Sequence, residues 1–138
     1  MIARHLMSAL KNRALEYPVV TLTGPRQSGK TTLCRTAFPE KPYSNLERPD
    51  IRNFAQLDPA GFLAQFPKCA VLDEVQRGPE LLSWIQVRVD EHKNAGEFIL
   101  TGSHQFELSR HISQSLAGRT ALLKLLPLSV AELCDAGQ

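Results

Sequence analysis

The stretch that decides the fold is Gly24-Pro25-Arg26-Gln27-Ser28-Gly29-Lys30-Thr31, which fits the pattern G-x-x-x-x-G-K-[ST] of a phosphate-binding P-loop. An apolar run at 19–22 precedes it and a helical stretch at 32–37 follows it, which is the setting that the motif requires. In such a loop, glycines let backbone N–H groups approach phosphate oxygens, and the next helix points its positive dipole end at them. The alternative is a glycine-containing turn that fits a loose pattern by chance.

Two residues of this loop have chemical roles of their own. The Lys30 ammonium would reach the β- and γ-phosphates, and the Thr31 hydroxyl would ligate Mg²⁺. The predicted nucleotide-binding residues are Gly24, Pro25, Arg26, Gln27, Ser28, Gly29, Lys30, Thr31 and Thr32.

Composition and charge are those of an ordinary globular domain. The 138 residues suffice for one domain with a hydrophobic core, and 43% of them are hydrophobic and 22% charged. The net charge of +2 is too small to indicate a nucleic-acid partner. Basic residues gather at the amino-terminal end, where residues 1–36 carry six Lys/Arg against one acid. This excess coincides with the predicted phosphate site and fits the charge of a nucleotide as well as it fits nucleic acid.

The three cysteines, Cys34, Cys69 and Cys134, form no CxxC pair, which favours reduced thiols in a cytosolic protein. Cys34 and Cys69 fall on a predicted helix and a predicted buried strand, so we expect both to be small apolar core residues. No apolar run reaches 18 residues, and the amino terminus lacks the pattern of a signal peptide. We therefore expect a cytoplasmic protein without a membrane segment.

Apolar runs alternate with helical stretches along the chain. Strands are predicted at 19–23, 69–72, 98–101 and 120–126, with a weaker one at 43–47. Helices are predicted at 2–16, from 30 to about 38, at 49–57, from 58 to about 66, at 80–94 and 105–115, with a further helix starting near 130. Such alternation indicates an α/β fold with a largely parallel sheet, whose ligands bind beyond the carboxyl ends of the strands.

Asp73 and Glu74 directly follow the buried strand at 69–72. In a P-loop NTPase, an aspartate at this place holds Mg²⁺ and an adjacent glutamate can activate the attacking water. One acid would thus neutralise metal charge while the other handles a proton. The alternative is a solvated acidic pair at a strand end.

Ser103 and Arg119 each allow two interpretations. Ser103 ends the strand at 98–101 and could contact the γ-phosphate or the attacking water, or it could simply cap the next helix. Arg119 precedes the last strand and could stabilise phosphoryl transfer in cis or in trans, or it could be a surface arginine in a turn. We expect the four histidines at the surface, Arg26 and Arg35 at the surface or in structural roles, and Trp84 in the core.

Four segments together go beyond a generic P-loop: 22–32 (LTGPRQSGKTT), 72–76 (LDEVQ), 100–103 (LTGS) and 115–119 (SLAGR). In this order they resemble the AAA-type ATP-binding domain of a large, poorly characterised prokaryotic ATPase family. The resemblance covers almost the whole chain, from residue 2 to residue 132. Members of the family usually carry a further C-terminal domain of unknown function.

The resemblance implies a three-layer P-loop NTPase with a mainly parallel five-stranded sheet in the order 5-1-4-3-2. It implies ATP and Mg²⁺ as ligands, with Lys30 and Thr31 in Walker A, and with Asp73 and Glu74 in Walker B. Ser103 takes the sensor position. Arg119 falls where such domains place an arginine that can reach a neighbour's nucleotide, which implies a homo-oligomer.

The resemblance also predicts a helical lid and a C-terminal domain, which residues 1–138 do not include. We expect these residues to form the AAA-type core of a fragment, a truncated open reading frame or an isolated domain, and the missing lid affects hydrolysis more than binding. The leading hypothesis is an ATPase, and its main alternative is a nucleotide-binding module without turnover. The Asp-Glu pair favours water over a kinase acceptor, no DNA-binding motif supports a DNA-associated ATPase, and no guanine-specific Asn-Lys-x-Asp signature is present.

Overall fold

The computed structural model describes residues 4–25, 29–103, 110 and 116–124, and the side chains of residues 4 and 5 are not described. The strands of this part are β1 (Val19–Thr23), β2 (Tyr43–Asn45), β3 (Ala70–Asp73), β4 (Phe98–Gly102) and β5 (Thr120–Lys124). The helices are α1 (Arg4–Glu16), α2 (Lys30–Ala37), α3 (Pro49–Leu57), α4 (Pro59–Ala64) and α5 (Leu81–His92), with a short 3₁₀ turn η1 (Val75–Arg77).

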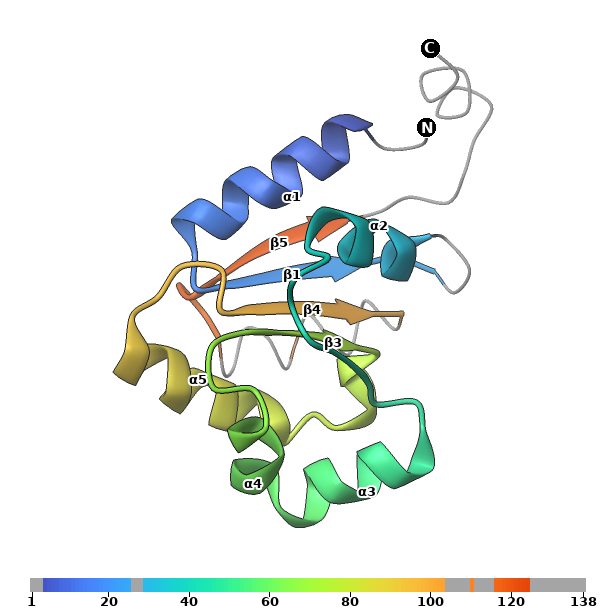
Figure 1. Cartoon of the computed structure of the whole chain (residues 1–138), viewed down its shortest axis with the longest axis vertical. Helices are drawn as coiled ribbons and strands as arrows, with labels where there is room; N and C mark the ends of the chain where they lie inside the picture. Colours follow the sequence, from blue (N-terminus) through green and yellow to red (C-terminus); the bar gives the residue numbers. More distant parts are fainter. Residues whose placement is uncertain (1–3, 26–28, 104–109, 111–115, 125–138) are drawn as a thin grey trace.

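The five strands form one parallel sheet in the order β2-β3-β4-β1-β5. Read from the other edge, this is the predicted order 5-1-4-3-2, so the fold prediction is confirmed. Figure 1 shows β5, β1, β4 and β3 side by side, with α1 and α2 on one side of them and α3, α4 and α5 on the other.

Two hydrophobic cores lie on the two faces of the sheet, because alternate residues of each strand point to opposite faces. In β4, Phe98 and Leu100 belong to the core under α3, α4 and α5, and Ile99 belongs to the core under α1 and α2. The helices contribute their apolar stripes to these cores. The largest fully buried side chains are Phe62, Phe98, Leu10, Leu22, Leu46, Leu72, Leu81, Leu82, Ile85, Ile99 and Leu100. The domain thus has three layers.

Local signals set the ends of several helices. Proline occupies the first turn of α3 and of α4, where its missing N–H leaves no intrahelical bond unmade. The Asp58 carboxylate caps α4 by accepting a hydrogen bond from the Gly61 N–H. Gly29, which has a left-handed backbone, is the N-cap of α2 and ends the phosphate-binding loop.

Some predictions about individual residues and elements need correction or fall outside the described residues. Trp84 was expected in the core, but it is 45% exposed, because the buried stripe of α5 runs through Leu81, Ile85 and Val89 and leaves Trp84 at its flank. Cys34 is buried as expected, whereas Cys69 precedes β3 and is only partly buried. Most of the predicted helix at 105–115, the last residues of the strand at 120–126 and the helix near 130 lie outside the described residues.

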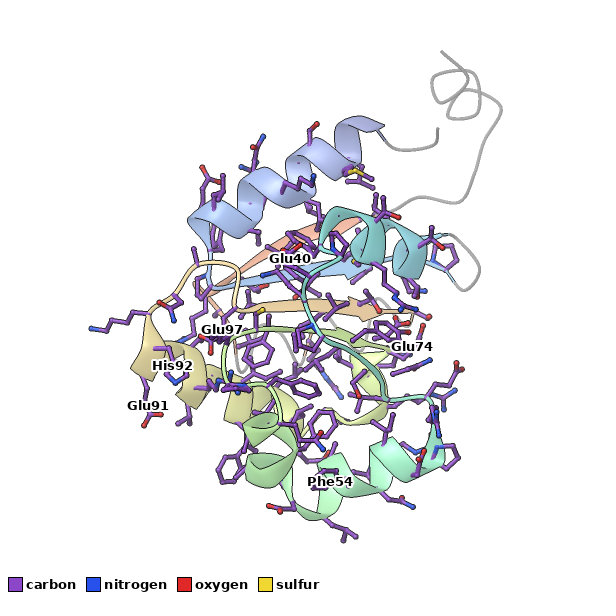
Figure 2. All side chains as sticks on the ribbon, viewed as in Figure 1. Glu40, Phe54, Glu74, Glu91, His92 and Glu97 are labelled. Carbon is purple, nitrogen blue, oxygen red and sulfur yellow. The ribbon has the colours of Figure 1, made fainter. Side chains whose placement is uncertain are left out.

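A buried ion pair between Arg88 and Glu97 lies near the amino-terminal end of β4 and has a structural function. Glu97 is almost fully buried, and its Oε2 accepts hydrogen bonds from Arg88 Nε and pairs with His92 Nδ1, each at 2.7 Å. Arg88 also donates to the backbone carbonyls of Leu63 and Phe66, so it ties α5 to the end of α4. Figure 2 shows Glu97 and His92 at the opposite end of the sheet from Glu74.

In the part of the chain that the structure describes, no helix combines the length and the apolar character that crossing a membrane demands.

Candidate active site

Five predicted site residues meet beyond the carboxyl-terminal ends of β1, β3 and β4. Lys30 Nζ lies 3.1 Å from Ser103 Oγ and 3.5 Å from Glu74 Oε2, and Thr31 Oγ1 donates to Asp73 Oδ2 at 2.7 Å. These residues are far apart in the sequence, and they meet because parallel strands end at the same edge of the sheet. The arrangement matches the expectation drawn from the strand ends.

The phosphate-binding loop leaves β1 at Gly24, whose N–H donates to Gly102 O at 3.1 Å and so fastens the loop to the end of β4. The loop returns at Gly29, which has a φ of +87°. A side chain at this φ would be strained, and among the described residues no atom that could clash with a Cβ lies within 4 Å of its place. The backbone conformation, rather than a lack of space beside described residues, therefore favours glycine here. Residues 26–28 lie outside the described residues.

Lys30 is buried at the start of α2, with only 3% of its surface exposed. Its ammonium donates to Pro25 O at 3.3 Å and to Ser103 Oγ, and it pairs with the buried carboxylate of Glu74. Each buried charge compensates the other, which offsets part of the cost of removing both from water. The ammonium therefore lies at the junction of the loop, β3 and β4.

Hydrogen bonds on both oxygens hold the Asp73 carboxylate. Oδ2 accepts from Thr31 Oγ1 and from the Tyr43 hydroxyl at 2.6 Å, and Oδ1 accepts from Thr101 Oγ1. Burial and the hydrogen bond to Asp73 raise the pKa of Tyr43 above its ordinary value. The Arg35 guanidinium is exposed, as predicted, and stacks over the Tyr43 ring at 4.4 Å from its centroid.

The sequence did not identify Tyr43 and Thr101 as parts of the site. Tyr43 stands on the edge strand β2 and pairs with Val71, so its long side chain reaches along β3 to Asp73. Thr101 follows Leu100, which pairs with Leu72, and this register places it beside Asp73. The only signal in the sequence was the position of Thr101 at a strand end.

Glu74 has a left-handed backbone, with φ 58° and ψ 49°. This conformation costs a residue other than glycine roughly 1–2 kcal/mol and persists only where its surroundings impose it. Here the Glu74 N–H donates to Thr101 Oγ1 at 3.1 Å, and the carboxylate accepts from Ser103 Oγ at 2.9 and 3.1 Å. The sharp turn after β3 thus directs the Glu74 side chain toward Lys30.

The oxygen atoms at this edge suit a magnesium ion. Mg²⁺ is a hard cation that is bound in proteins through one or two carboxylates, with phosphate oxygens and water completing its shell. Asp73 supplies a carboxylate and Thr31 a hydroxyl, with 2.7 Å between their oxygens. Both residues are fixed by the strand and helix that carry them, so the donor set fits the ion.

Arg119 lies at the amino-terminal ends of the strands, whereas these residues lie at the carboxyl-terminal ends. It immediately precedes β5, and its carbonyl accepts a hydrogen bond from the N–H of Val19, the first residue of β1. Its guanidinium makes a bidentate contact with Asp90 on α5, at 2.7 and 3.0 Å. This contact raises the pKa of Arg119 and lowers that of Asp90. The structure therefore does not bring Arg119 to the Lys30 site of its own chain.

The parallel sheet, the glycine loop after β1 and the acidic pair at the end of β3 together define a P-loop NTPase fold. A family model described as an AAA domain matches residues 16–134, which is most of the chain. The protein belongs to this family of AAA domains. The comparison confirms the family expected from the four sequence segments.

Two curated relatives agree with this assignment. They are the uncharacterised proteins Mb2031c of Mycobacterium bovis and Rv2008c of Mycobacterium tuberculosis, each 36% identical over 135 residues. The match covers 96% of this chain but only 31% of each relative. The chain therefore spans about a third of the length of the curated relatives it matches.

A solved structure shows the same fold. The Walker-type ATPase PABY2304 of Pyrococcus abyssi superposes with a TM-score of 0.66 at 18% identity. The alignment covers 94% of this chain and 55% of that protein. At this identity the likeness concerns the fold alone.

Proposed function

We propose that this domain binds ATP at the loop formed by residues 24–32 and hydrolyses it to ADP and phosphate with Mg²⁺. The observation that carries the proposal is the meeting of Lys30, Glu74 and Ser103 beside the Thr31–Asp73 pair. The carboxyl-terminal ends of the strands thereby hold together a phosphate-binding cation, a carboxylate base and an oxygen donor set for Mg²⁺. The AAA domain family and the Walker-type fold support the same proposal.

In this proposal each residue has one task. Backbone N–H groups at residues 24–32 and the Lys30 ammonium bind the phosphates, and Ser103 contacts the γ-phosphate or the attacking water. Thr31 and Asp73 would hold Mg²⁺, which when bound supplies positive charge to the phosphate oxygens. When the Lys30 ammonium binds the phosphates, its contact with Glu74 weakens. One oxygen of the Glu74 carboxylate then becomes available to accept a hydrogen bond from water.

Glu74 then acts as the general base. Water attacks the γ-phosphorus, its proton passes to the Glu74 carboxylate, and the bond from the γ-phosphorus to the β–γ bridging oxygen breaks. The products are ADP and inorganic phosphate. The Glu74 carboxylate already lies 3.5 Å from the Lys30 ammonium, so the base is carried on the side of the loop where the phosphates bind.

The second candidate is a nucleotide-binding module without turnover. The observation that favours it is the set of contacts on Glu74, since Lys30 and Ser103 both hold the carboxylate in the buried cluster. A domain in which nucleotide does not release these contacts would bind ATP and leave Glu74 unavailable to water.

Phosphate release decides between the two candidates. Wild type, Glu74→Gln and the control Glu91→Gln are compared with saturating Mg-ATP. Glu91 is an exposed glutamate on α5, far from Glu74 in Figure 2. Loss of a general base should lower turnover by about 100-fold or more in Glu74→Gln alone, with ATP affinity retained. Wild type that binds ATP without turnover at any protein concentration would establish the module without turnover.

We further propose that Arg119 acts on the nucleotide of a neighbouring copy in a homo-oligomer. Its partly exposed guanidinium lies at the amino-terminal ends of the strands, remote from its own Lys30, so only a second chain could bring a nucleotide to it. Turnover per chain should then rise with protein concentration in wild type and fall at least about tenfold in Arg119→Ala. Arg48→Ala removes another exposed arginine that pairs with an aspartate and is the matched control. Equal turnover in the two variants would refute the role in trans.

We propose a cytoplasmic location, because the cysteines in the part of the chain that the structure describes, Cys34 and Cys69, are free thiols.

A further inference from the structure

Gln76 lies in η1, two residues after Glu74, and its side-chain amide bridges two residues of the proposed site. Its Nε2 donates to Glu74 Oε1 at 2.6 Å, and its Oε1 accepts from the backbone N–H of Ser103 at 3.3 Å. A carboxylate can only accept and a backbone N–H can only donate, so this pair of partners fixes the orientation of the amide. Gln76 thereby connects the residue after β3 to the residue after β4.

Gln76 and Lys30 contact different oxygens of the Glu74 carboxylate. Oε1 accepts from Gln76 Nε2 and Oε2 faces Lys30 Nζ at 3.5 Å, whereas Ser103 Oγ lies within hydrogen-bond distance of both oxygens, at 2.9 and 3.1 Å. The last torsion of a glutamate side chain is broad and roughly two-fold, so nothing within the residue itself selects one orientation. Among the contacts to this carboxylate, the hydrogen bond from Gln76 is made to Oε1 alone and so distinguishes the two oxygens.

We propose that Gln76 is a positioning residue that holds Oε1 of Glu74 and thereby presents Oε2 to the attacking water. This inference rests on the proposed hydrolysis, because Glu74 is the base there. An amide is required, since one end must donate to a carboxylate and the other must accept from the Ser103 N–H. Glutamate at position 76 keeps the acceptor and loses the donor, and methionine of similar length loses both.

The test compares Gln76→Glu and Gln76→Met with Gln56→Met. Gln56 is exposed on α3 and donates to Arg77 O, so its replacement removes a glutamine contact to the same turn without touching Glu74. Because a misplaced catalytic group loses up to about 100-fold, we expect kcat to fall about ten- to 100-fold in both Gln76 variants. Mg-ATP affinity should stay within about threefold of wild type, since uniform binding is unchanged.

A double-mutant cycle separates positioning from a general effect on folding. In the Glu74→Gln background there is no carboxylate base left to position, so Gln76→Met should lower the residual turnover no further. A role in folding alone would instead lower turnover by the same factor in both backgrounds. Wild-type kcat in Gln76→Met, or additive losses in the cycle, would overturn the inference.

An amide NMR measurement tests the contact even if the wild type shows no turnover. The Gln76 side-chain amide signals are identified by their loss in Gln76→Met. One proton should be shifted downfield in wild type and return to the ordinary range in Glu74→Ala, while the Gln56 amide stays unchanged. Gln76 signals that do not respond to Glu74→Ala would refute the inference, whereas a response without turnover would refute only the proposed hydrolysis.

Discussion

One hydroxyl supports both acidic residues of the candidate site. Thr101 is fully buried in β4, where its Oγ1 donates to Asp73 Oδ1 and accepts from the Glu74 N–H at 3.1 Å. Thr101→Val preserves the shape of the side chain and removes the hydroxyl. A buried carboxylate oxygen and a buried backbone N–H then lose a partner together.

The expected loss follows from these two contacts. A hydrogen bond to a charged group contributes about 1.5–3 kcal/mol, and a buried donor left unpaired costs about 1–3 kcal/mol. We therefore expect Thr101→Val to lower the free energy of unfolding by about 3–5 kcal/mol. With a urea m-value of about 1–3 kcal/mol per M, the unfolding midpoint should fall by about 1 M or more.

Urea unfolding followed by circular dichroism measures this loss, with Thr21→Val as the matched control. Thr21 is equally buried in the adjacent strand β1, but its hydroxyl lies 3.0 Å from the neutral hydroxyl of Thr120. The control should lose only about 1 kcal/mol. If Thr101→Val loses no more than Thr21→Val, the hydroxyl does not support the acidic pair and the reasoning is refuted.

Three further predictions concern other buried groups. Arg88→Met leaves the buried Glu97 carboxylate without its guanidinium partner, so we expect the free energy of unfolding in urea to fall by about 3–5 kcal/mol. The control Arg48→Met removes an exposed arginine and should lower it by less than about 1 kcal/mol, and equal losses in the two variants would contradict the prediction. Because its pKa is raised, the Tyr43 phenol should ionise above the ordinary range in an ultraviolet titration, and a late step that survives in Tyr43→Phe would contradict this assignment. Burial raises the pKa of the Cys34 thiol from 9.0 to about 12, so its contribution to stability is full below pH 9. It should be lost at about 1.4 kcal/mol per pH unit from there towards pH 12, and Cys34→Ala should show a shallower loss, whereas identical slopes would refute the shift.

Much of the fold could be predicted from the alternation of short apolar runs with helical stretches. The strand at 19–23 was predicted within the bounds that the structure shows, and those at 69–72 and 98–101 within one residue. Periodicity could not place Trp84, because a side chain at the flank of an apolar stripe can be buried or exposed, depending on how the helix is rotated against its neighbours. Strand order came from the family resemblance, since apolar runs alone do not specify which strands are neighbours.

Some residues of the candidate site could be predicted from the sequence and others could not. Lys30 could be found because it lies in a motif of restricted residue types, and Asp73 and Glu74 because they lie at the end of a buried strand. Tyr43 could not, since its contact with Asp73 depends on the register of β2 against β3. The position of Arg119 could have been deduced. It precedes a strand parallel to β1, so it must lie at the amino-terminal ends of the strands, whereas the phosphate loop lies at their carboxyl-terminal ends.

The central claim is that the loop at residues 24–32 binds the phosphates of ATP through Lys30. Calorimetric titration of Mg-ATP into wild type, Lys30→Ala and the control Lys41→Ala tests it most directly, since Lys41 also donates to a backbone carbonyl but at the opposite edge of the sheet. Removal of one charged contact worth about 1.5–3 kcal/mol should weaken binding about ten- to 100-fold in Lys30→Ala and leave Lys41→Ala unchanged. Equal affinity in Lys30→Ala and wild type, or no binding of ATP to wild type, would contradict the claim.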